Sequence, residues 1–203
     1  MNRKVCAALT ILMLGLLSCI GTEGVGSGTA DDDNGADDDF DDDSSDCANP
    51  NNIGMDELYT MADFALYDEN NNPQNLYSLC WHVVLVVSAV GWCPYCTNEA
   101  KHIAADIYEP YHEQGLEIFF TLFEDDQHNP PSQAYLQWYK SNYQLPFHVY
   151  SDPTCFLCPY QDTYPDTTVP FNILLDKHMV IRLEKVGYSP KTLKSYIEAL
   201  LNE

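Results

Sequence analysis

The stretch VVLVVSAVGWCPYC, residues 83–96, decides the fold of this 203-residue chain. Its first eight residues form an almost unbroken β-branched run, which is typical of a strand buried on both faces of a sheet that helices cover. Its last six residues, 91–96, place two cysteines with a two-residue spacer where this strand ends. The stretch therefore predicts the junction between a central strand and a helix in an α/β domain.

Apolar residues of helical period follow this stretch and predict one helix that Gly115 ends. The stripe consists of Ala100, Ile103, Ala104, Ile107, Tyr108 and Tyr111. Further along the chain, the spacing of apolar residues and the positions of turn residues predict a second strand, a helix, a short strand, a hairpin and a closing helix. Their expected ranges are 116–123, 132–144, 147–150, 171–175 with 179–183, and 190–201. Residues 47–203 are thus expected to form one α/β domain.

The pair Cys93 and Cys96 carries the predicted chemistry. A cysteine at a helix N-terminus faces unpaired backbone N–H groups and the positive end of the helix dipole, and both favour its thiolate form. Pro94 fits the first helical turn, where its missing N–H removes no intrahelical hydrogen bond. In such a site Cys93 attacks and forms a mixed disulfide with the substrate, and Cys96 resolves it.

These residues resemble the thioredoxin superfamily and, within it, the TlpA/ResA-like extracytoplasmic thiol-disulfide oxidoreductases. The resemblance covers roughly residues 55–202 and rests on Trp92-Cys-x-x-Cys after a hydrophobic strand, on ADFAL at residues 62–66, and on Val169-Pro170 before the hairpin. It implies a thioredoxin-like fold, with a central mixed β-sheet flanked by helices. It also implies that the active site needs no cofactor or metal.

The resemblance assigns roles to the residues around the cysteines. Pro170 is expected to be cis and to lie beside Cys93, and Val169 is expected to offer backbone groups to a substrate chain. Trp92 is expected to shield the disulfide. The spacer residues Pro94 and Tyr95 complete the expected substrate-binding surface.

A proton acceptor for the buried cysteine has to be found elsewhere than in many thioredoxins. Those proteins carry a buried carboxylate six residues before the first cysteine, where this chain has Val87. Glu124, just after the second predicted strand, matches by position the glutamate of ResA-like proteins. The resemblance therefore implies a catalytic role for Glu124, and the alternative is a solvated loop acid.

A second CxxC motif, Cys155 and Cys158, lies ahead of Pro170. An oxidising compartment favours a structural disulfide here, and the alternative is a redox relay to the first pair, because the loop leads into the segment expected to pack by the active site. A zinc site formed by the two motifs is disfavoured, because 58 residues separate Cys96 from Cys155, against about 15 to 20 in zinc ribbons. Cys47 and Cys80 could bridge and fasten the start of the domain, but the sequence does not define their pairing.

The N-terminal region predicts export and a lipid anchor. Two basic residues precede an apolar run of 13 residues, 5–17, which is too short to span a bilayer core of about 30 Å. The run ends in Leu-Leu-Ser-Cys, which resembles a bacterial lipobox, so residues 1–18 are expected to be a signal peptide and Cys19 to carry lipid. Residues 19–46 hold ten aspartates after position 30 and are expected to be a disordered acidic linker. Ile20 favours an outer-membrane location facing the periplasm.

The charge balance limits the class of partner. With 9 basic against 31 acidic residues, the net charge of −22 repels nucleic acids. The sequence therefore predicts a membrane-anchored thiol-disulfide oxidoreductase in the bacterial cell envelope. Its partners are expected to be cysteine-containing extracytoplasmic proteins, together with a redox partner that resets the cysteine pair. The alternatives are a non-catalytic lipoprotein that uses the fold as a binding scaffold, with every cysteine locked, and a thiol-dependent peroxidase.

Overall fold

The fold is taken from a computed structural model, which describes residues 52–161 and 166–203. The predicted signal peptide, Cys19, the acidic linker and Cys47 lie outside the described residues.

A mixed sheet of seven strands forms the centre of the described region, in the order β2-β1-β5-β4-β3-β6-β7. In β3 all eight residues are buried, which confirms the prediction for residues 83–90. It pairs in parallel with β4 and antiparallel with β6. The strands are β1 Ala65–Asp68, β2 Pro73–Asn75, β3 Val83–Val90, β4 Leu116–Glu124, β5 Val149–Ser151, β6 Phe171–Leu175 and β7 Ile181–Val186.

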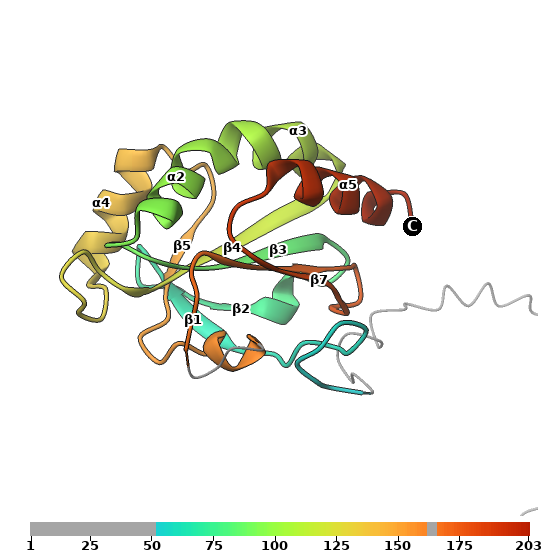
Figure 1. The fold of residues 1–203 in the computed structure, drawn as a ribbon, viewed down its shortest axis with the longest axis horizontal. Coiled ribbons are helices and arrows are strands. Elements are labelled where there is room, and N and C mark those ends of the chain that lie inside the picture. The colour runs from blue at the N-terminus through green and yellow to red at the C-terminus, as the bar shows by residue number, and fades with distance from the viewer. Residues whose placement is uncertain (1–51, 162–165) are drawn as a thin grey trace, which may run out of the picture. The chain divides into compact units, whose positions relative to one another are not determined.

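The longer helices cover one side of this sheet, as Figure 1 shows, and η4 lies on the other side. They are α2 Pro94–Ile103, α4 Gln133–Tyr143 and α5 Pro190–Leu201, with the short α3 Glu109–Tyr111. The remaining turns are η1 Leu76–Leu79, η2 Ala104–Tyr108, η3 His112–Gln114 and η4 Cys158–Tyr160. Within the described residues, no helix combines the length and the apolar character that a membrane crossing requires.

The single helix expected between the cysteines and Gly115 is divided in the structure. Its middle turn, η2, is a π-helix, and Pro110 follows it at the start of α3. Proline has no N–H to donate to the carbonyl four residues earlier, and its ring clashes with that carbonyl in a regular α-helix, so a wider turn relieves the conflict. The predicted stop is confirmed, because Gly115 has a φ of 103° in the left-handed region.

Two apolar cores lie on opposite faces of the sheet. Side chains alternate along β3, so that Val83, Leu85 and Val87 join the core that also contains Cys93 and Cys96. Val84 and Val86 join the other core, which Leu157 and Tyr160 of the second CxxC region share. The faces therefore separate the two CxxC motifs.

The hairpin near the C-terminus begins its second strand later than the sequence predicted. Met179 belongs to the turn, where its φ is 63°. The Asp176 carboxylate accepts hydrogen bonds from the backbone N–H groups of His178 and Val180, at 2.9 and 3.0 Å, and so fixes this turn. As a result β7 starts at Ile181 and not at residue 179.

Candidate active site

The cysteine pair lies where β3 passes into α2. Cys93 is the N-cap residue of α2, Pro94 is at the start of the helix, and Cys96 lies in the first turn. The Cys93 carbonyl accepts the Thr97 N–H at 3.0 Å, which closes this turn. Both thiols are free, and Cys93 retains 5% exposure while Cys96 has none.

The loop before β6 meets Cys93 from the neighbouring part of the sheet. The Val169–Pro170 peptide bond is cis, as the resemblance implied. The Cys93 thiol donates to the Val169 carbonyl, with 3.7 Å between the sulfur and the oxygen. The Pro170 carbonyl in turn accepts the Gly187 N–H at 2.8 Å, which ties this loop to the end of β7. The structure thus brings together residues that are 76 positions apart in the chain.

The aromatic residues of the motif are on the surface. Trp92 is 42% exposed and Tyr95 is 75% exposed, so both are available to a docking chain. The Trp92 indole N–H donates to the Glu124 carboxylate at 2.6 Å. Glu124 therefore holds the indole, and its carboxylate is engaged at the mouth of the site.

Glu99 is the carboxylate that sequence reasoning missed. It lies on α2 three residues after Cys96, and it is fully buried. Among the described residues neither of its carboxylate oxygens has a hydrogen-bond partner. Burial raises the pKa of Glu99 to about 8. The spacing of three on a predicted helix was the signal in the sequence, because residues three apart share one face.

Burial also raises the pKa of the Cys96 thiol above its ordinary value, and the nearby Cys93 and Glu99 add to this shift. Asn172 of β6 is the polar neighbour of Glu99 and acts to lower the pKa of its carboxyl. Its side-chain nitrogen and oxygen form no hydrogen bond of ordinary geometry among the described residues. In register Asn172 lies opposite Val87, the position where many thioredoxins carry their acid. The buried acid of this protein therefore comes from the helix and not from the strand.

The second CxxC motif is oxidised. Cys155 and Cys158 form a disulfide in the loop after β5, and Cys80 is also disulfide-bonded. The buried Asp152 carboxylate accepts the Phe156 N–H at 2.9 Å and so shapes the same loop. The motif runs into a short 3₁₀ turn that begins at Cys158, whereas the first pair lies at the start of the longer helix α2.

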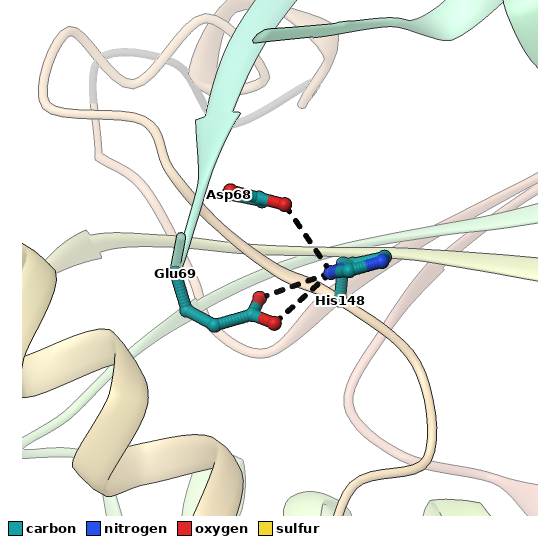
Figure 2. A group of neighbouring side chains, drawn as sticks. All are labelled: Asp68, Glu69 and His148. Carbon is teal, nitrogen blue, oxygen red and sulfur yellow. Dashed lines mark hydrogen bonds and ion pairs between the residues drawn. The ribbon is translucent and has the colours of Figure 1, made fainter. Parts of the chain in front are cut away.

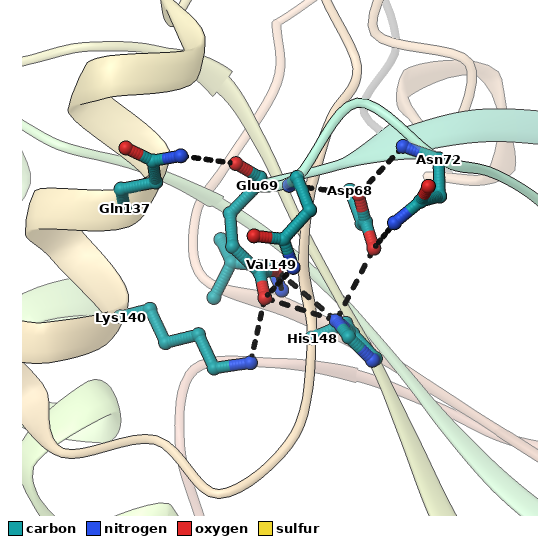
Figure 3. Close-up of polar contacts among 8 residues, drawn as sticks. Asp68, Glu69, Asn72, Gln137, Lys140, His148 and Val149 are labelled. Atoms are coloured by element: carbon teal, nitrogen blue, oxygen red, sulfur yellow. Dashed lines mark hydrogen bonds and ion pairs between the residues drawn. The ribbon is translucent and has the colours of Figure 1, made fainter.

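One cluster in the described region has the composition of a metal site. Figure 2 shows the His148 ring between the carboxylates of Asp68 and Glu69. Figure 3 shows that these groups already have protein partners. Glu69 binds the Lys140 ammonium at 2.7 Å and the Val149 N–H at 3.1 Å, and His148 Nδ1 lies 3.0 Å from the same carboxylate. A cation there would have to displace the ammonium, so this cluster is a structural network that joins β1, α4 and β5.

Comparison with solved structures supports the fold. A protein assigned as thiol:disulfide interchange protein DsbE from Chlorobium tepidum is 18% identical, with a TM-score of 0.60 over 73% of this chain and 99% of that one. A secreted thiol-disulfide isomerase from Corynebacterium glutamicum is 17% identical, with a TM-score of 0.60 over 74% and 90%. The thioredoxin domain of a thiol-disulfide oxidoreductase from Bacteroides vulgatus is 14% identical, with a TM-score of 0.58 over 73% and 100%. A comparison with curated proteins found no match.

A match to a family model shows which family the chain belongs to, whereas the distantly related structures show only its fold. The model of the Redoxin family matches residues 59–201, which include β1 to β7, both free cysteines and the cis-proline loop. The match spans well over half of the chain. The chain therefore belongs to the Redoxin family, and its fold is thioredoxin-like.

Proposed function

We propose that this thioredoxin-like oxidoreductase exchanges disulfides with cysteine-containing extracytoplasmic proteins through Cys93 and Cys96. The observation that carries the proposal is the arrangement at the start of α2. Two free thiols lie within one helical turn, and the first of them contacts the carbonyl before a cis-proline. A substrate chain that pairs with Val169 would bring its sulfur to Cys93.

The reaction has two steps that balance without a cofactor. In the first, the Cys93 thiolate attacks one sulfur of a substrate disulfide, and the other substrate sulfur leaves as a thiolate. In the second, Cys96 loses its proton and attacks the Cys93 sulfur, which releases the remaining substrate sulfur. The substrate gains two electrons, and the enzyme is left with a Cys93–Cys96 disulfide. The same steps in reverse oxidise a substrate dithiol.

Glu99 is our candidate for the proton acceptor of Cys96. Burial keeps the Cys96 thiol protonated near neutral pH, so the second step needs a base. Glu99 is also buried and lies one turn away on the same helix, and its raised pKa of about 8 is close to neutral, which suits proton transfer in either direction. Glu124 is not carried into this role, because its carboxylate binds the Trp92 indole.

The rest of the site supplies substrate contacts. Trp92, Pro94 and Tyr95 present an exposed surface on one side of Cys93, and Val169 with Pro170 lies on the other. Exposed aromatic rings beside a backbone carbonyl suit an extended segment with one reactive sulfur and do not demand a particular sequence.

The location follows from the N-terminal sequence. We propose cleavage after residue 18 and lipid on Cys19, with residues 19–46 as a tether between an envelope membrane and the catalytic domain. The support is the basic start, the short apolar run and the Leu-Leu-Ser-Cys sequence. Metabolic labelling with a fatty acid should mark the wild type and not Cys19→Ser. Equal labelling of both would contradict the anchor.

Cysteine variants test the exchange itself. Cys93→Ser should abolish turnover of a protein disulfide, and Cys96→Ser should accumulate a mixed disulfide with the substrate that non-reducing electrophoresis detects. A double Cys155→Ser, Cys158→Ser variant serves as the matched control, because it removes the other CxxC pair, whose neighbours Leu157 and Tyr160 lie in the core on the opposite face of the sheet. Turnover that survives in Cys93→Ser would refute the mechanism.

A further inference from the structure

We propose that Glu124 and His128 form a clamp that holds the Trp92 indole in the orientation that protein substrates bind. This inference rests on the proposed function and adds a specificity device to it. Glu124 and His128 are positioning residues, because they act through Trp92 and not on the reacting sulfurs. The two residues are called the Trp92 clamp below.

Three contacts define the Trp92 clamp. The indole N–H donates to Glu124 Oε2 at 2.6 Å, a short hydrogen bond to a charged acceptor. His128 Nδ1 lies 3.3 Å from the same oxygen. The imidazole also contacts the indole in a tilted arrangement, with ring centroids 4.8 Å apart and an interplanar angle of 31°. Glu124 therefore restrains the N–H edge of the indole, and His128 contacts its rings.

The clamp residues are themselves fixed by the loop after β4. The Asp125 carboxylate accepts the N–H groups of Gln127 and Asn129 at 2.8 and 2.9 Å, and its own N–H donates to the Asn129 carbonyl at 2.8 Å. These bonds close a tight turn in which His128 takes a φ of 62°. The turn thus directs the imidazole back toward the indole.

A backbone contact joins this loop to the cysteine motif. The Gly91 N–H donates to the Glu124 carbonyl at 2.9 Å. A Cβ at position 91 would lie 2.8 Å from the backbone of Asp125 and Asp126, so only glycine permits this approach. This contact therefore holds the start of the loop after β4 against the residue that precedes Trp92.

The position of Trp92 makes its orientation matter for large substrates. Trp92 directly precedes the nucleophile and is 42% exposed, although a hydrogen bond and a tilted ring contact restrain its indole. A restrained exposed aromatic ring offers contact area without the entropy loss that a mobile ring pays on binding. A small disulfide needs only Cys93, whereas a protein segment also spans the indole. We therefore expect the clamp to act mainly on the KM for protein substrates.

The test compares two substrates. Glu124→Ala and His128→Ala should each raise the KM for a disulfide-bonded peptide by about threefold to tenfold, with a smaller change in its kcat. Turnover of hydroxyethyl disulfide should be affected less. Glu124→Gln should recover most of the peptide KM, because its amide oxygen can still accept the indole N–H. Gln127→Ala, an exposed neighbour in the same loop, is the matched control and should behave as wild type.

A spectroscopic readout separates the clamp from general stability. In a Trp81→Phe, Trp138→Phe background, Trp92 is the single tryptophan of the chain. Its time-resolved fluorescence anisotropy should decay faster when either clamp residue is replaced by alanine.

The outcomes decide between the possible roles. An unchanged peptide KM in both alanine variants would overturn the proposal. An equal fall in kcat for peptide and small disulfide in Glu124→Ala would also overturn it, because it would place Glu124 in proton transfer. If wild type turned over neither substrate, the proposed function would fail, and unchanged anisotropy in the variants would separately refute the clamp.

Discussion

Replacement of the buried acid beside the cysteines, Glu99→Gln, gives a prediction whose size follows from the structure. The Glu99 carboxyl has its ordinary pKa of 4.5 in the unfolded chain, and burial raises this pKa to about 8 in the folded protein. Between these values the folded protein keeps a proton that the unfolded chain has lost, so stability falls as the pH rises. Each pH unit in this window costs about 1.4 kcal/mol.

The free energy of unfolding of the reduced wild type should therefore fall by about 3 kcal/mol between pH 4.5 and pH 7, because of this group alone. It should level off above about pH 8, where both states have lost the proton. Glutamine has nearly the same volume and no charge, so the variant should lack this dependence and gain stability relative to wild type as the pH rises.

Urea denaturation at several pH values, with dithiothreitol present, measures how the free energy of unfolding differs between wild type and Glu99→Gln. Glu109→Gln, an exposed acid in the same helical region, is the control and should run parallel to wild type. In stopped-flow experiments, the rate at which Cys96 resolves a mixed disulfide should lose its inflection near pH 8 in Glu99→Gln. Parallel stability curves for wild type and Glu99→Gln would refute both the raised pKa and the proton acceptor.

Three further changes test parts of the fold that support the site. The double Cys155→Ser, Cys158→Ser variant should lower the free energy of unfolding by about 2 kcal/mol, since the disulfide closes a short loop, and should leave exchange at the first pair intact. Gly91→Ala should cost about 1 to 3 kcal/mol in chemical denaturation, because its Cβ meets the immovable backbone of the loop after β4. Lys140→Met should cost about 1 to 3 kcal/mol at pH 7, because it removes a charged partner of the buried Glu69. For each of these three variants, a midpoint of unfolding equal to that of wild type would contradict the predicted loss of stability.

The parts of the fold that follow from sequence are those with a strong local pattern. The buried strand at 83–90 and the closing helix at 190–201 match the structure at both ends, because their apolar periods are long and uninterrupted. The β1–β2 hairpin and the pairing of β1 with β5 were not predicted. Their strands have only three or four residues, so tertiary pairing and not local pattern determines them.

The site also has parts that the sequence indicates and parts that only the structure shows. Spacing alone indicated the cysteine pair, and the resemblance indicated the cis-proline loop that the structure brings to Cys93. Glu99 was missed because a glutamate on a helix is usually solvated, and only the packed structure shows that it is buried. Glu124 and Trp92 are 32 positions apart, and no local pattern connects them.

The placement of the two CxxC motifs in different cores has a consequence for how the molecule handles electrons. Disulfide exchange needs one sulfur to attack another directly, and the residues around Cys155 and Cys158 pack in the core across the sheet from Cys93. The sheet thus lies between Cys93 and Cys96, the pair proposed to react, and the core that borders the Cys155–Cys158 disulfide. In the proposed exchange, two electrons per turnover would pass through Cys93 and Cys96, and the Cys155–Cys158 disulfide is expected to stay closed and to keep supporting its loop.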